Sequence, residues 1–327
     1  MKTLLKAVAA VVLLLVMTAA AIFYLHPLWV ADTQIRLHLW RSGIRSQYVQ
    51  AGANRIHYFE AFPPAPSHGG EPGPGIPLVL IHGLDSRGED WSPMIPTLSA
   101  HGFHVYVPDL PGFGRSDHPD ADYSIAFEAQ AVADFMQAVH LTHSDVIGWS
   151  MGGWVAAKLT LTHPEMVDRL GLFDSAGIYF PYTFDASLFL PTDAAGLARL
   201  SYMLSPVPHK IPAFAVRDAL RRLASERTVV ERSIDQMFSG RDLLDFRLQL
   251  IQKPTLIVWG ADDRLIPLSA GQTMHRDMPQ SVLLVVEGCG HLTPGECAKP
   301  VLQETIAFLT ANPPQAGVTL TAPKPAP

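Results

Sequence analysis

The chain has 327 residues, a length that suits two domains or one large α/β domain carrying an insertion. Its composition, with 48% hydrophobic and 17% charged residues, excludes a chain that is disordered throughout. The formal charge of −6 argues against a nucleic-acid-binding protein, which needs a basic face.

The first predicted element is a membrane helix. The stretch from Ala7 to Leu25 carries no charged residue and follows Lys2 and Lys6. It exceeds the ~7–15 apolar residues of a signal-peptide core and approaches the ~20 that cross a bilayer. We therefore expect residues 1–45 to hold a single-pass membrane anchor and a connector, with Trp29 at the lipid interface. The alternative is a signal peptide, cleaved after its alanine run, which would leave a secreted or periplasmic protein. Basic residues on both sides leave the orientation open.

Six short apolar runs predict the strands of a mostly parallel sheet. Segments with helical spacing separate them, an alternation typical of an α/β fold with helices on both faces of the sheet. A hairpin over Ser46–Gln50 and Arg55–Glu60 precedes the runs, and a proline- and glycine-rich surface connection from Phe62 to Pro77 follows it. The six runs are Leu78–Ile81, Val105–Val107, Val146–Ile147, Leu170–Phe173, Thr255–Val258 and Val282–Val286.

The alternation breaks between Gly177 and Leu250, where no parallel-strand pattern appears. A segment of this length is too long for a structureless loop, so we expect a helical cap over residues 177–250. The core would then comprise residues 46–176 and 251–311. We expect the proline- and alanine-rich tail, residues 312–327, to be disordered.

The motif Gly148-Trp149-Ser150-Met151-Gly152 follows one predicted strand and precedes a helical stretch. Glycines at both ends allow a tight strand-to-helix turn, which would hold the serine in a strained conformation with its hydroxyl exposed. We therefore expect Ser150 to be a nucleophile.

A serine hydroxyl needs an adjacent base, which a carboxylate in turn orients. His291 follows the last predicted strand, and Asp263 follows the strand before it. Catalytic groups gather at the carboxyl ends of such strands. We expect His291 to be the base and Asp263 the orienting acid, with Asp174, which ends the strand before the cap, as the alternative acid.

Two backbone N–H groups are expected to stabilise the oxyanion that forms during acyl transfer. One belongs to Leu84, in the turn His82-Gly83-Leu84 after the first apolar run, and the other to Met151, directly after the nucleophile. We interpret His82 as a packing residue that shapes this turn.

These residues together resemble the α/β-hydrolase superfamily from about Ser46 to Thr310. The segment Asp109–Ser116 is similar to the family's turn after its fourth strand, and the D-x-x-x-P pattern at Asp263–Pro267 favours Asp263 as the acid. The family's cap follows the sixth strand, which matches Gly177–Leu250. Ser-Met-Gly-Gly, His-Gly-Leu with Asp90-Trp91 downstream, and the apolar N-terminus look like membrane-associated monoacylglycerol lipases and related bacterial lipases.

The resemblance implies a serine carboxylesterase that cleaves a lipophilic ester, such as a monoacylglycerol, through an acyl-enzyme. Its partners would be the ester or lipid substrate and the membrane, with no nucleic acid. A serine nucleophile disfavours the dehalogenases and epoxide hydrolases, which have an aspartate there. Carbon–carbon bond hydrolases and cofactor-free haloperoxidases keep the serine, and a catalytically silent, membrane-tethered binding protein is a further alternative. No cofactor and no metal is expected, because the sequence has no H-E-x-x-H and no G-x-G-x-x-G after a strand.

Cys289 and Cys297, the only cysteines, flank His291. They are too few for a disulfide scaffold or a four-cysteine zinc site. We expect two buried free thiols, since an unpaired cysteine behaves as a small apolar residue. A disulfide is the alternative if the domain faces an oxidising compartment.

Aromatic residues are dense at the start of the cap, from Tyr179 to Phe184 and again at Phe189. We expect this edge of the cap to face the membrane and to admit an acyl chain, because exposed rings need a partner. Packing inside the cap is the alternative.

Overall fold

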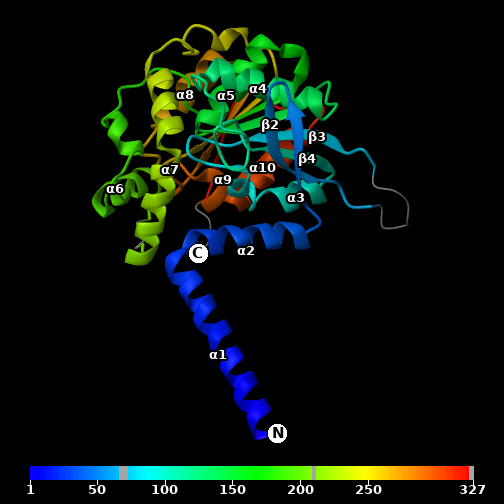
Figure 1. The fold of residues 1–327 in the computed structure, drawn as a ribbon. Helices are drawn as coiled ribbons and strands as arrows, with labels where there is room; N and C mark the ends of the chain where they lie inside the picture. Colours follow the sequence, from blue (N-terminus) through cyan, green and yellow to red (C-terminus); the bar gives the residue numbers. More distant parts are fainter. Residues whose placement is uncertain (66–72, 208–210, 324–327) are drawn as a thin grey trace.

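A single mixed sheet organises the chain in the computed structural model, which describes residues 1–65, 73–207 and 211–323 (Figure 1). Within these residues, nine strands pair in the order β1-β2-β4-β3-β5-β6-β7-β8-β9. β1 and β2 are antiparallel to their neighbours, and the others run parallel. The strands are β1 (Arg45–Ala51), β2 (Asn54–Ala61), β3 (Ile76–Ile81), β4 (Phe103–Pro108), β5 (Ser144–Trp149), β6 (Val167–Phe173), β7 (Thr255–Gly260), β8 (Ser281–Val286) and β9 (Val318–Ala322).

Helices cover both faces of the sheet, which confirms the predicted fold class. On one face lie α4 (Ile125–Ala138), α5 (Met151–Thr162) and α8 (Leu268–Asp277). On the other lie α3 (Ile95–Ala100), α9 (Thr293–Glu296) and α10 (Ala298–Thr310). Each central strand contains an apolar run that is covered on both faces; in β3, for example, Leu78 to Ile81 are all fully buried. Most of the connection predicted from Phe62 to Pro77 lies outside the described residues.

Cap helices follow β6, as predicted. They are α6 (Ala194–Leu204) and the long helix α7 (Ala213–Phe238), after which the chain returns to the sheet at β7. The aspartate before α6, Asp193, accepts a hydrogen bond from the backbone N–H of Gly196 at 2.7 Å and so caps that helix.

Two expectations about the C-terminal part of the chain are wrong. The tail is not disordered throughout, because β9 pairs with β8 in parallel and extends the sheet by one strand. Cys289 and Cys297 are not free thiols but form a disulfide with an S–S distance of 2.06 Å. The physical reason is position: the loop after β8 returns Cys297 to within bonding distance of Cys289, a proximity that sequence spacing alone does not fix.

The N-terminal region forms two helices. α1 (Lys2–Leu25) is long and apolar enough to span a membrane, and none of its residues is buried. Both a membrane anchor and a signal sequence fit that description. α2 (Pro27–Arg41), which the sequence analysis treats as a connector, lies along the domain beneath α9 and α3 (Figure 1). Its Leu39 is fully buried in the same core as α3 and α10.

Candidate active site

The serine of the G-x-S-x-G motif lies on a sharp turn between β5 and α5. Its φ of 56° lies in the left-handed region, which side chains other than glycine rarely adopt. A Cβ atom added at Gly148 would lie 2.0 Å from the carbonyl oxygen of Gly152, and one added at Gly152 would lie 2.4 Å from that of His82. Only glycine fits at either position, so the turn brings Ser150 to the carboxyl edge of the sheet.

Side chains that follow β5, β7 and β8 form a hydrogen-bonded row. His291 Nε2 lies 2.9 Å from Ser150 Oγ, and His291 Nδ1 lies 2.8 Å from Asp263 Oδ2. Asp263 Oδ1 accepts the backbone N–H groups of Leu265 and Ile266 at 2.8 and 3.0 Å. The carboxylate thus has a fixed orientation and favours the imidazole with its proton on Nδ1, which leaves Nε2 able to accept the serine proton.

Asp174, the alternative acid, lies behind this row. Its buried carboxyl group accepts hydrogen bonds from the backbone N–H of Gly260, at 2.8 Å, and from the hydroxyl of Thr293. Burial, together with the nearby Asp263 carboxylate, raises the pKa of Asp174 well above its usual value. With these hydrogen bonds, the neutral Asp174 supports the loops that carry Asp263 and His291. Of the two acids, only Asp263 is within hydrogen-bond distance of the imidazole.

The electrostatics around His291 favour its action as a base. Burial opposes the charged form, but the Asp263 carboxylate outweighs this effect and raises the pKa of His291 above its ordinary value. The imidazolium that would form on proton transfer from Ser150 is therefore stabilised. The Trp149 indole N–H donates to the carbonyl oxygen of His291 at 2.7 Å and fixes the backbone of the histidine loop.

Leu84 and Met151, the two expected oxyanion donors, flank the serine. Met151 is the first residue of α5, and Leu84 lines the same cavities as Ser150. A Cβ atom added at Gly83 would lie 3.1 Å from the Cβ of Ser150, so the backbone leading to Leu84 passes close to the nucleophile. A developing oxyanion between the two N–H groups would be stabilised by fixed dipoles.

His82 holds this turn in place. Its Nδ1 donates to the carbonyl oxygen of Gly83 at 2.8 Å, and its Nε2 accepts the backbone N–H of Leu110 at 2.9 Å. Burial lowers the pKa of His82 and keeps the ring neutral. Both ring nitrogens are thus engaged with the backbone, in agreement with the interpretation of His82 as a packing residue.

Two cavities meet at Ser150. One, of about 290 Å³, extends under the cap and has mainly aromatic and aliphatic walls. The other, of about 310 Å³, opens between the loop after β3 and α9 and carries carboxyl groups on its wall. Volumes of this size fit small organic ligands. Among the described residues, no cluster of three or more His, Cys, Asp and Glu side chains is arranged to hold a metal ion.

The acidic wall of the second cavity was not predicted from the sequence; it is formed by Asp85, Asp90 and Glu296. Asp85 has a φ of 54°, and burial together with the adjacent Glu226 carboxyl group of α7 raises its pKa to about 8. The position of Asp85 in the sequence could have predicted its place in the site. It directly follows the His-Gly-Leu turn, which is expected to lie next to Ser150. Glu296 carries no such signal.

The aromatic run at the start of the cap lines the first cavity. Phe180 and Phe184 pack against the buried core, and Tyr182 contacts Phe238, the last residue of α7, with ring centroids 5.0 Å apart. The end of α1 instead packs against Phe214, near the start of α7. At 1.5 Å per residue, these two ends of α7 are about 36 Å apart. The structure therefore favours packing inside the cap over an edge that faces the membrane.

Comparisons with known proteins agree with this geometry. A family model described as "Alpha/beta hydrolase family" matches residues 78–304. The chain is 33% identical over 247 residues to 2-hydroxymuconate semialdehyde hydrolase of Pseudomonas putida, covering 69% of this chain and 84% of that protein. It is 26% identical over 251 residues to Lipase 3 of Moraxella sp. (strain TA144), covering 72% of this chain and 77% of the lipase.

Among solved structures, the chain is similar to the crystal structure of a bacterial membrane phospholipase A. The TM-score is 0.76 at 26% identity, with 93% of this chain and 98% of the phospholipase chain covered. The match therefore extends over nearly the whole of both chains.

Proposed function

The chain belongs to the alpha/beta hydrolase family, and from that premise we propose that it is a membrane-anchored serine carboxylesterase that cleaves neutral acyl esters, such as monoacylglycerols. The observation that carries the proposal is the row Ser150–His291–Asp263, hydrogen-bonded at 2.9 and 2.8 Å where an apolar and an acidic cavity meet.

The proposed reaction is two-step acyl transfer. Ser150 Oγ attacks the ester carbonyl while His291 Nε2 takes its proton, and Asp263 stabilises the resulting imidazolium. The N–H groups of Leu84 and Met151 stabilise the oxyanion. His291 then protonates the leaving alcohol, which departs as an acyl-enzyme forms on Ser150. A water molecule, deprotonated by His291, releases the acid and regenerates the hydroxyl.

The two cavities suggest how the substrate is oriented. Aromatic walls such as those of Phe180 and Phe184 suit an acyl chain, which has no polar group to satisfy. The second cavity suits a neutral polar alcohol, because Asp85 and Asp90 can exchange hydrogen bonds with hydroxyl groups.

Carbon–carbon bond hydrolysis is the main rival reaction, since the relatives include 2-hydroxy-6-oxo-6-phenylhexa-2,4-dienoate hydrolase of Burkholderia cepacia. A dienoate carries a carboxylate, which a binding site normally pairs with a cation. Among the described residues, neither cavity is lined by a lysine or an arginine, whereas Asp85 and Asp90 line one of them. A carboxylate at Asp90 also disfavours a phosphate-bearing substrate, so a neutral ester fits this site best.

We propose further that α1 is retained as an anchor and that the domain lies outside the cytoplasm. The last turn of α1 is attached to the cap: Phe23 and Tyr24 contact Phe214, with centroids 5.7 and 5.5 Å apart. The disulfide between Cys289 and Cys297 supports an oxidising compartment, since cytosolic thiols are kept reduced.

A substrate panel tests the proposed reaction. The full chain in detergent is assayed on a monoacylglycerol, a lysophospholipid with the same acyl chain, and 2-hydroxymuconate semialdehyde. We expect the monoacylglycerol to be hydrolysed fastest and the semialdehyde to be left intact. Faster cleavage of the semialdehyde would make the protein a carbon–carbon bond hydrolase.

Replacing Ser150 with Ala is the matched control, because it removes the nucleophile and leaves the turn unchanged. It should lower kcat by about 10⁵-fold or more and abolish labelling by a fluorophosphonate. A wild-type chain that is neither labelled at Ser150 nor active on any ester would be the catalytically silent binding protein instead.

A further inference from the structure

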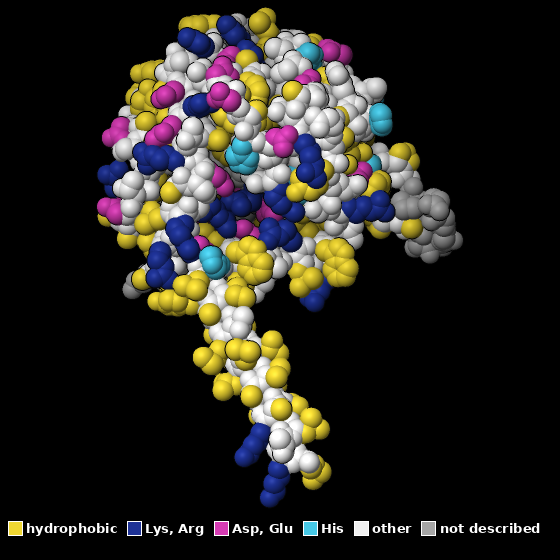
Figure 2. All heavy atoms as spheres, in the orientation of Figure 1, with side chains coloured by type: hydrophobic (Ala, Val, Ile, Leu, Met, Phe, Trp, Pro, Cys, Tyr) yellow, Lys and Arg dark blue, Asp and Glu magenta, His cyan; other side chains and the backbone are white. Residues whose placement is uncertain are grey.

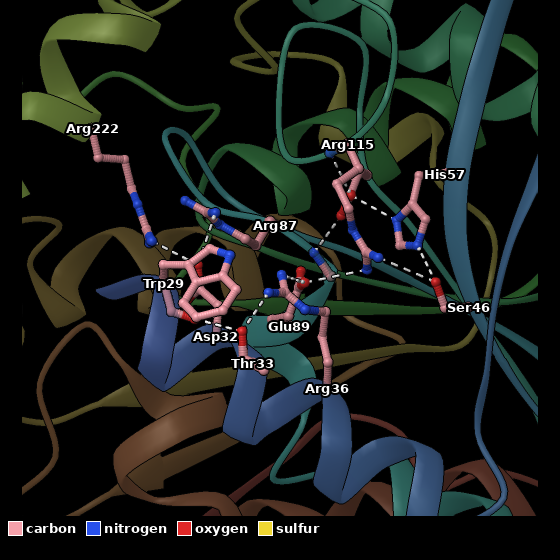
Figure 3. Close-up of polar contacts among 12 residues, drawn as sticks. Trp29, Asp32, Thr33, Arg36, Ser46, His57, Arg87, Glu89, Arg115 and Arg222 are labelled. Atoms are coloured by element: carbon pink, nitrogen blue, oxygen red, sulfur yellow. Dashed lines mark hydrogen bonds and ion pairs between the residues drawn. The ribbon is translucent and has the colours of Figure 1, made fainter. Parts of the chain in front are cut away.

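The helix α2 has a face that is fixed to the domain. Leu39 is fully buried, and Asp32 forms ion pairs with Arg222 of the cap helix α7, at 2.6 Å, and with Arg87 of the loop after β3, at 3.6 Å (Figure 3). The backbone N–H of Leu28 donates to Asp218 of α7 at 2.9 Å. α2 is therefore held in one orientation, and its outer face is a defined surface of the molecule.

That outer face carries large apolar side chains. Trp29, Leu37 and Trp40 are 54%, 41% and 71% exposed. At 3.6 residues per turn, they lie within about 80° of one another around the helix axis. Figure 2 shows hydrophobic side chains gathered on the underside of the domain, around the point where α1 leaves it. Exposed apolar patches commonly mark a site that contacts a protein or a membrane.

The position of α2 in the chain identifies that partner. α1 ends at Leu25 and α2 begins at Pro27, so the start of α2 lies where a membrane-spanning α1 leaves the hydrocarbon. Tryptophan is enriched at that depth, because its ring is apolar and its N–H is polar. Exposed cations border the stripe: Arg41 at the end of α2, and Arg217, which lies over the ring of Tyr24. They complement lipid phosphates.

We infer that α2 is an interfacial helix, which lies in the plane of the bilayer surface with Trp29, Leu37 and Trp40 inserted among the lipid headgroups. This inference rests on the proposed anchoring of α1. It goes beyond anchoring because it fixes which side of the domain faces the lipid. The acidic cavity lies on that side, since α2 contacts the 3-10 helix Gly88–Trp91, which supplies Asp90 to the cavity wall. An ester in the bilayer would thus reach Ser150 from the α2 side.

Depth measurements on the full chain in phosphatidylcholine/phosphatidylglycerol vesicles test the inference. Because the native cysteines form a disulfide, single cysteines placed by Trp29→Cys and Trp40→Cys can be labelled with an environment-sensitive fluorophore. We expect both labels to be quenched several-fold more by a nitroxide at the lipid headgroup than a label at Phe246→Cys. Phe246 is 90% exposed and follows the end of α7 that lies away from α1, so it is the matched control. Val12→Cys, within α1, should respond to a nitroxide deep in the acyl region.

Two outcomes would overturn the inference. Labels at positions 29 and 40 that are as accessible to water as the label at 246 would show that α2 faces solvent. Labels shielded from lipid nitroxides but showing energy transfer between copies would show that a second chain covers the stripe. Neither readout needs a substrate, so each is independent of the proposed esterase activity.

An activity assay provides a second readout. The double variant Trp29→Ser, Trp40→Ser should hydrolyse a vesicle-borne monoacylglycerol at least about threefold more slowly than wild type while hydrolysing p-nitrophenyl acetate at the wild-type rate, a change of about 0.7 kcal/mol or more. The variant Phe246→Ser should change neither rate. Equal losses on both substrates would show that the tryptophans support the fold of the site and not its contact with lipid.

Discussion

The carboxylate of Asp263 both orients His291 and sets its charge. One oxygen contacts His291 Nδ1 at 2.8 Å, and the other is held by two backbone N–H groups. Asp174 is also buried, but it accepts its hydrogen bonds from Gly260 and Thr293. The roles of the two acids can therefore be separated by experiment.

Replacing Asp263 with Asn should lower kcat by about 10⁴-fold, because an amide does not hold the required imidazole tautomer. The Asp263 charge is the main contribution that raises the pKa of His291, and the base must be neutral to act. The acid limb of the residual kcat/KM profile should therefore move to lower pH. Asp174→Asn should leave the acid limb of the kcat/KM profile at nearly the same pH as in wild type. A limb that moves only in the Asp174 variant would make Asp174 the orienting acid.

Glu128, on α4 and outside the cavities at Ser150, allows a test of how a buried carboxyl group affects stability. Its carboxyl oxygens are buried without a hydrogen-bond partner among the described residues, and burial raises its pKa well above the usual value. In the unfolded chain this carboxyl ionises near its ordinary pKa of about 4.3, while in the folded chain it stays protonated. Unfolding thus releases a proton above that pH, and the free energy of unfolding must fall as the pH rises.

Glu128→Gln should remove this contribution. The free energy of unfolding of the variant minus that of wild type should grow by up to about 1.4 kcal/mol per pH unit above pH 4.5, until the folded-state pKa is reached. Urea denaturation of both proteins at several pH values between 5 and 8 measures this difference. A difference that stays constant over that range would show that Glu128 is ionised in the folded chain.

At the scale of elements, a disulfide joins the two ends of the loop that carries His291. Cys289 follows β8, Cys297 precedes α10, and the disulfide joins them with a Cα–Cα distance of 6.3 Å. Both cysteines are buried in the core beneath the site. The bridge therefore restricts the loop in the unfolded chain and holds its two ends together in the folded one.

Replacing both cysteines with Ser should lower the free energy of unfolding by about 2–3 kcal/mol, as expected for a bridge that closes a loop of this length. A reductant should lower the Tm of wild type to about that of the double variant. It should leave the Tm of the double variant, which is the control, unchanged. Thermal denaturation with and without reductant measures both effects. An unchanged Tm for reduced wild type would show that the bridge contributes no stability.

At the scale of the whole molecule, the N-terminal helices are connected to the site and to the cap. Arg36 of α2 pairs with Glu89 at 3.4 Å, and Arg115, which also reaches Ser46 of β1, contacts the same carboxylate at 3.2 Å (Figure 3). Asp32 lies at the other end of this network, between Arg87 and Arg222. The helix α2, the loop after β3 and the cap therefore form one connected unit.

Asp32→Ala should lower the free energy of unfolding by about 1–2 kcal/mol, because it leaves Arg87 and Arg222 partly buried without their shared partner. The Tm should fall by a few degrees. Asp277→Ala, which breaks the exposed pair with Arg276, is the matched control and should change stability by less than about 0.5 kcal/mol. Equal Tm values for the two variants would show that the ion pairs of Asp32 do not help to attach α2 to the domain.

Local sequence patterns determined the elements of the core and the order of its chemical groups. Apolar runs marked the central strands, since the part of a strand that is covered on both faces is mostly apolar. Glycines at 148 and 152 fixed the turn that presents Ser150, because no other residue fits there. Each of these features depends on neighbours along the chain, which is why they can be read without coordinates.

Tertiary structure alone decided the features that depend on distances between segments far apart in sequence. It joined Cys289 to Cys297, added β9 to the edge of the sheet, and gave Asp174 its own partners, Gly260 and Thr293. It also turned a presumed connector into a helix packed against the cap. Contacts of this kind arise from the folded arrangement of whole elements, and no local pattern of hydrophobicity, charge or glycine specifies them.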